Sequence, residues 1–155
     1  MVNLERRQAL KTGGALGLWG LFASLGLAPT LAQAEWNKSL FAAKTMNEAL
    51  DAIGAVLPAN SDAITLVVPE IAENGAVVPI NVSSTLPNAT QIMVFVDKNP
   101  NMLTANFNLP AGTECFVTTR VKMAQTANVI VLVKADGKLY RASKEVKVTQ
   151  GGCGG

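Results

Sequence analysis

The sequence contains no histidine, only two cysteines and few charged or aromatic residues. The absence of histidine excludes Ser-His-Asp and Cys-His nucleophile arrangements and every metal site that needs an imidazole ligand. Two cysteines also argue against a structural zinc site. What is abundant is apolar: 49% of the 155 residues are hydrophobic and 15% are charged, which suits one domain with a sizeable core. We therefore expect no metal and no cofactor.

The few charges are unevenly placed. Three of the thirteen basic residues, Arg6, Arg7 and Lys11, lie in the first 34 residues, with Glu5 as the single acidic residue among the eleven. The rest of the chain is left with ten basic and ten acidic residues and is neutral. This balance predicts no nucleic-acid partner, because such partners require a basic footprint, and no basic patch for a membrane surface.

The first 34 residues have the features of an export signal. Residues 13–34 are uncharged, rich in Gly, Ala and Leu, and end in the small-x-small pattern Ala-Gln-Ala. The pair Arg6-Arg7 ahead of this run resembles the twin-arginine export signal. An uncharged run of this length could alternatively anchor the chain in a membrane, but Pro29 interrupts it.

We therefore predict that residues 1–34 are a twin-arginine-type signal peptide, cleaved between Ala34 and Glu35. Twin-arginine export moves proteins that are already folded. The mature protein is expected in a bacterial periplasm, with no stable membrane insertion after cleavage.

The mature chain begins with a helical pattern and continues with strand patterns. Apolar residues at Met46, Ala49, Leu50 and Ile53 follow helical spacing and predict one amphipathic helix over residues 38–54, ended by Gly54. From residue 64 onward, eight short β-branched runs alternate with turn sequences. The predicted fold of residues 35–149 is therefore mainly β, an antiparallel immunoglobulin-like β-sandwich with one N-terminal amphipathic helix.

The predicted strands differ in which faces are apolar. In "LTANFNL", Leu103, Ala105, Phe107 and Leu109 should share one face. In contrast, "QIMVFV" and "NVIVLV" are apolar on both faces, whereas a two-layer sandwich buries one face of each strand. The helix can cover one such patch and a partner subunit the other. The alternative is that central strands tolerate apolar residues on both sides.

The two cysteines are not equivalent. Cys115 has the strand parity of Val117, Val121 and Met123, so we expect it to point inward as an inert, buried residue. Cys153 stands in the C-terminal "GGCGG", where four glycines supply no side chain to pack. We expect residues 150–155 to form a flexible arm with an accessible thiol. A 115–153 disulfide is disfavoured, because the tail would have to fold back to a sulfur inside the core.

An accessible cysteine on a glycine arm has two plausible uses. It could form an intermolecular disulfide, or it could hold a small cargo through sulfur. A backbone without side chains is thin enough to enter a narrow channel in another protein. Measured from Thr149, the arm would reach on the order of 15 Å, enough to place the sulfur in a partner's active site.

Several segments and their order resemble one known family. The "GGCGG" terminus, the twin-arginine-like leader, "PEIAENGAVVPINVSS", "KNPNMLTANFNL" and the final "TRVKMAQTANVIVLVKADGKLYRASKEVKVTQGGCGG" are similar to SoxY, the sulfur-carrier subunit of the Sox thiosulfate-oxidation system. The resemblance implies that Cys153 is the covalent attachment site. It further implies a swinging arm made of Gly151, Gly152, Gly154 and Gly155.

The resemblance also implies partners. These are a SoxZ-like β-sandwich subunit in a heterodimer, a SoxAX-like cytochrome that couples thiosulfate to the carrier, a SoxB-like hydrolase that releases sulfate, and in some organisms a sulfur dehydrogenase. On this interpretation the protein is not an enzyme but a carrier acted on by enzymes. The alternative function is a secreted structural β-sandwich whose tail cysteine forms an intermolecular disulfide.

Overall fold

The computed structural model describes residues 37–151, which form two short helices and nine strands in that range. The predicted signal peptide, with Arg6 and Arg7, and the predicted arm residues 152–155 lie outside the described residues. The elements are α2 (Lys38–Ala42), α3 (Met46–Ala52), β1 (Ala59–Asn60), β2 (Ile64–Val67), β3 (Ile71–Ala72), β4 (Val78–Ser84), β5 (Ala89–Val96), β6 (Leu103–Asn108), β7 (Phe116–Val121), β8 (Ala127–Ala135) and β9 (Lys138–Val148).

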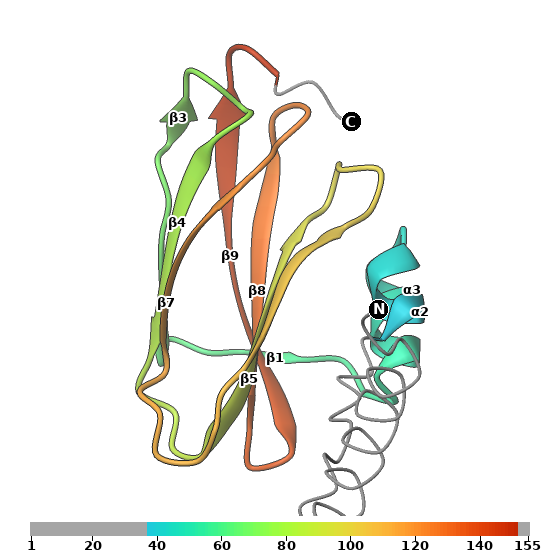
Figure 1. Ribbon diagram of the computed structural model, residues 1–155, viewed down its shortest axis with the longest axis vertical. Coiled ribbons are helices and arrows are strands. Elements are labelled where there is room, and N and C mark those ends of the chain that lie inside the picture. The colour runs from blue at the N-terminus through green and yellow to red at the C-terminus, as the bar shows by residue number, and fades with distance from the viewer. Residues whose placement is uncertain (1–36, 152–155) are drawn as a thin grey trace, which may run out of the picture. The chain divides into compact units, whose positions relative to one another are not determined.

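The strands form two facing sheets, as the sequence predicted. The larger sheet has the order β1-β9-β8-β5-β6, with β3 pairing a second stretch of β9, and the smaller sheet has the order β2-β4-β7. Figure 1 shows the smaller sheet on the left and the two helices on the right, on the outer side of the larger sheet. The molecule therefore has three layers, in which the larger sheet is central.

Two strand pairings differ from the predicted antiparallel sandwich. β1 and β3 both run parallel to β9, with Ala59 opposite Tyr140 and Ile71 opposite Lys147. Both are only two residues long, and neither was recognised in the sequence. The runs "KLYRA" and "KEVKVT", predicted as two strands, form the single strand β9, which is long enough to pair with β1 near one end and β3 near the other. The sheet is therefore mixed.

The hairpin between β8 and β9 follows the prediction. Asp136 and Gly137 both have positive φ, 49° and 74°, which is the requirement of a type I′ turn. Glycine adopts this conformation without steric cost, and aspartate is among the few side chains that tolerate it.

The single helix predicted over residues 38–54 is two helices, and the capping residues explain the break. Thr45 is extended, and its hydroxyl accepts a hydrogen bond from the Glu48 amide at 3.2 Å. The Glu48 carboxylate in turn accepts one from the Lys44 amide at 2.8 Å. This arrangement is a variant of the Thr-x-x-Glu capping box, in which the glutamate accepts from the amide of Lys44, the residue before the N-cap, and it starts a new helix. The motif is present in the sequence and was overlooked because the apolar spacing continues across it.

Both faces of β5 and β8 are buried within this chain. Ile92, Val94 and Val96 of β5 pack toward the smaller sheet. Met93 and Phe95 of β5, with Ile130 and Leu132 of β8, pack against the helices. Each such side chain contributes about 1.5–3 kcal/mol when it leaves water, so leaving this outer face open would be costly. The helices cover the outer patch and the smaller sheet the inner one, so the inference of a partner from these two strands is wrong.

A β-bulge changes the face of one predicted core residue. The β5–β6 register shifts between Val94 and Phe95, so that Val94 lies opposite Ala105 and Phe95 opposite Leu103. Thr104 is the extra residue, and its hydroxyl donates to the Val94 carbonyl at 2.9 Å. Because a one-residue shift moves a side chain to the other face, Leu103 joins the helix side while Ala105 stays on the inner side.

Candidate functional site

The last described residues leave the sandwich at the end where β9 finishes. Backbone hydrogen bonds attach this segment to the end of β3 and to the loop that follows it: the Thr149 amide donates to the Ala72 carbonyl at 3.1 Å, and the Gly75 amide donates to the Gln150 carbonyl at 2.8 Å. The Thr149 hydroxyl also donates to the Glu73 carbonyl at 3.2 Å. The chain is thus held up to Gln150, and the predicted arm starts from this fixed point.

The loop between β7 and β8 closes the other side of the same segment. The Val148 amide donates to the Thr126 hydroxyl at 3.0 Å. The Met123 amide donates to the Gly75 carbonyl at 2.7 Å, which ties this loop to the β3–β4 loop. These residues were missed in the sequence because most of the contacts use backbone atoms, which leave no side-chain pattern.

The predicted site residues have different positions. Gly151 is exposed at the end of the described chain, directly after Gln150. Gly152, Cys153, Gly154 and Gly155 lie outside the described residues.

Cys115 is buried, as predicted. It is 7% exposed in the inner core, next to the first residue of β7. Burial raises the pKa of its thiol above the ordinary value, and a hydrogen bond with the Ser84 side chain lowers that pKa only in part. Because the thiolate is the reactive form, this thiol is a poor nucleophile near neutral pH.

A disulfide between Cys115 and the tail is excluded by distance. β9 ends at the top of Figure 1, whereas β7 begins toward the bottom. Ala124, which lies beside Gly151, is nine positions along a mostly extended path from Cys115, and at about 3.3 Å per position this path spans roughly 30 Å. From Gly151 the backbone can carry residue 153 only about 7 Å farther.

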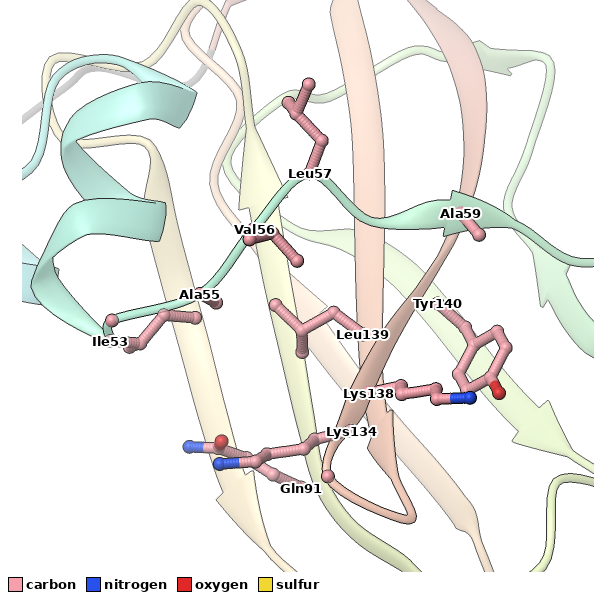
Figure 2. Close-up of a pocket in the computed structure, with 12 residues that line it drawn as sticks. Ile53, Ala55, Val56, Leu57, Ala59, Gln91, Lys134, Lys138, Leu139 and Tyr140 are labelled. Carbon is pink, nitrogen blue, oxygen red and sulfur yellow. The ribbon is translucent and has the colours of Figure 1, made fainter.

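A pocket of about 440 Å³ lies far from this segment, beside the β8–β9 hairpin (Figure 2). One wall is the chain between α3 and β1, where Val56 and Leu57 are 87% and 80% exposed. Leu139 lies below Val56, and Lys134 and Lys138 extend from the hairpin to either side. The described residues that line the pocket include no cysteine and no acidic residue.

Within residues 37–151, no three His, Cys, Asp or Glu side chains gather where they could hold a metal ion. In the same part of the chain, no helix has the length and apolar character needed to cross a membrane.

Comparisons with known proteins give the family. No curated protein matches the chain. A superoxide reductase (neelaredoxin) from Ignicoccus hospitalis is 19% identical, with 56% of this chain and 79% of that chain covered, but its TM-score of 0.49 supports no argument. The structure of the sulfur carrier protein SoxY from Chlorobium limicola f thiosulfatophilum is 44% identical, with 66% of this chain and 94% of that chain covered and a TM-score of 0.60.

The family model for the sulfur oxidation protein SoxY matches residues 50–153 of this sequence. The match takes in the sandwich, the segment fixed at the end of β9 and Cys153 itself. On this match and the similarity to the solved carrier, the chain belongs to the SoxY family of sulfur oxidation proteins.

Proposed function

We propose that this protein is a covalent sulfur carrier in thiosulfate oxidation, with Cys153 as the attachment site. The observation that carries the proposal is a family match that extends through Cys153, on a chain whose other cysteine is buried and has a raised pKa. The relative from Chlorobium is described as a sulfur carrier protein. The protein itself does no catalysis on this proposal.

The proposed loading step joins the sulfane sulfur of thiosulfate to the Cys153 sulfur. A thiol and thiosulfate give an S–S bond that bears a sulfonate group, with release of one proton and two electrons. A c-type cytochrome of the SoxAX type would accept the electrons. A SoxB-type hydrolase would then add water and release sulfate, which leaves a persulfide on the carrier without further oxidation. A sulfur dehydrogenase could oxidise that persulfide. These are states that an exposed thiol can reach.

The proposed location is the periplasm, reached through a twin-arginine signal that contains Arg6 and Arg7. The neutral charge balance beyond residue 34 supplies no basic footprint for a nucleic-acid or membrane-surface partner.

The proposal is tested by mass spectrometry of the mature protein after incubation with thiosulfate and the loading cytochrome. We expect the mass of a thiosulfate group on the C-terminal peptide and its removal by a thiol reductant. A gain on the peptide that contains Cys115 would contradict the site. If the only product were a disulfide-linked homodimer, the structural-disulfide alternative would replace the carrier function.

We further propose that a second, SoxZ-like β-subunit binds this chain, and that the pocket in Figure 2 is part of its contact surface. Two adjacent, highly exposed apolar side chains, Val56 and Leu57, mark such surfaces in soluble proteins. Lys134 and Lys138 line the same pocket, so the matching segment of the partner should be apolar and acidic.

The double substitution Val56→Ser and Leu57→Ser is expected to weaken binding of the second subunit at least about tenfold, because it removes two apolar contacts of about 1 kcal/mol or more each. The measurement is calorimetry with the purified subunit. Val67→Ser is the matched control, since Val67 is 52% exposed on β2 in the other sheet. If the control weakens binding and the double variant does not, the contact surface is the smaller sheet.

A further inference from the structure

We propose that Gly151 is the fixed root of the carrier arm, a positioning residue on which the free arm turns, and not part of the free arm itself. The inference rests on the carrier function proposed above. It concerns the residue at which the arm begins, which determines how far the sulfur can reach.

The first observation is the lack of space at Gly151. A Cβ atom added there would meet the Ala124 carbonyl oxygen far inside contact distance, with the Ala124 carbonyl carbon at 3.4 Å. The φ of Gly151 lies outside the left-handed region that favours glycine. Glycine is therefore required at this position by close backbone approach and not by its dihedral angles. At Gly54, Gly112 and Gly137, by contrast, an added Cβ atom would lie in open space.

The second observation is that the atoms around Gly151 cannot easily retreat. The Ala124 amide donates to the Asn99 side-chain oxygen at 3.2 Å, and the Asn99 side-chain nitrogen donates to the Lys122 carbonyl at 2.7 Å. On the other side, Gly75 is buried and bonds to both Gln150 and Met123. Backbone contacts from two loops thus hold the segment, and a methyl group at position 151 must displace either the Ala124 carbonyl or Gly151 itself.

The consequence is a short free tether. From Gly151 to Cys153 the backbone spans about 7 Å, half of the reach expected when the arm is counted from Thr149. The local concentration of a tethered group at a partner's site falls roughly as the −3/2 power of tether length. If Gly151 leaves its seat, the last hydrogen-bonded residue is Gln150, the tether lengthens from about two to about three residues, and that concentration falls about twofold.

The test compares Gly151→Ala with Gly152→Ala in the full mature chain. In Gly151→Ala we expect amide hydrogen exchange at Gly75 and Thr149 to become about tenfold faster, because hydrogen bonds that hold the segment are disturbed. Sulfate release by the reconstituted partners should fall about twofold. The unfolding midpoint and the rate of Cys153 labelling by maleimide should stay at the wild-type values, which separates positioning from a general loss of structure. Gly152→Ala should leave the exchange of both amides unchanged.

Wild-type exchange at Gly75 and wild-type sulfate release in Gly151→Ala would overturn the proposal. Faster exchange with undiminished sulfate release would also overturn it, because the seat would then not position the sulfur. If Gly151→Ala does not fold, Thr149→Val tests the same fixed segment by removing the hydrogen bond from the Thr149 hydroxyl to the Glu73 carbonyl. This variant should also make amide exchange faster and sulfate release slower. The exchange measurement needs no sulfur chemistry, so it can show the seat of Gly151 even when no sulfur is loaded. A failure of the carrier function is therefore distinguishable from a failure of the proposal about Gly151.

Discussion

Thiosulfate oxidation by the reconstituted system is expected to fall to the carrier-free background when Cys153 is replaced by serine. A serine hydroxyl cannot form the S–S bond that holds the cargo, so no step after loading can proceed. The folded domain should be unaffected, since the described sandwich ends before this residue. The measurements are sulfate production and, as a check on folding, the unfolding midpoint.

Cys115→Ala is the matched control. It removes the other thiol of the chain from the inner core, and we expect full activity with a loss of about 1 kcal/mol in the free energy of unfolding. In Cys153→Ser, maleimide labelling of Cys115 should be slow near neutral pH. The raised pKa keeps that thiol protonated, so labelling should increase as the pH rises toward that pKa or on denaturation. Activity that depends on Cys115 and survives in Cys153→Ser would disprove the assignment.

Valine next to the carrier cysteine is expected to reduce processing by the downstream enzymes on the order of 100-fold. Gly152→Val and Gly154→Val each add a β-branched side chain and remove the positive-φ conformations open to glycine. If the arm enters a narrow channel, both changes obstruct entry, and small misplacements of a reacting group are costly. The measurement is sulfate release at saturating thiosulfate for each variant beside wild type.

Two controls make this result specific to the channel. The rate of Cys153 labelling by a small maleimide should stay close to wild type in both variants, because a small reagent needs no channel. Gln150→Val places the same β-branched side chain at an exposed position before the glycines and should leave processing near wild type. Wild-type turnover in both glycine variants would show that the arm is not threaded, and a surface disulfide would tolerate the valines equally well.

The two predictions depend on different parts of the chain. On the proposed function, Cys153 supplies the chemistry, and the glycines beside it supply access. The seat at Gly151 would add a third requirement, namely that the short free segment starts from a defined point. A substitution at each position should therefore affect a different measurement: loading, processing, and amide exchange at the root.

The sequence alone predicted the structure correctly wherever residues within one short segment determine it. The parity of Cys115 with Val121 and Met123 predicted its burial, because successive side chains in a strand point to opposite faces. Asp136-Gly137 predicted its hairpin for a similarly local reason, since few residues accept positive φ. The resemblance to SoxY, which the family match confirms, also came from the sequence.

Tertiary structure decided what depends on segments that are distant in the chain. The bulge at Val94 and Phe95 sent Leu103 to the helix side, and the helices, not a partner, cover the outer faces of β5 and β8. The seat of Gly151 against Ala124 forms only when two loops meet the end of β9. Backbone carbonyl and amide groups are the same in every residue except for the missing amide of proline, so contacts between them leave no mark in the sequence, and only the folded chain reveals them.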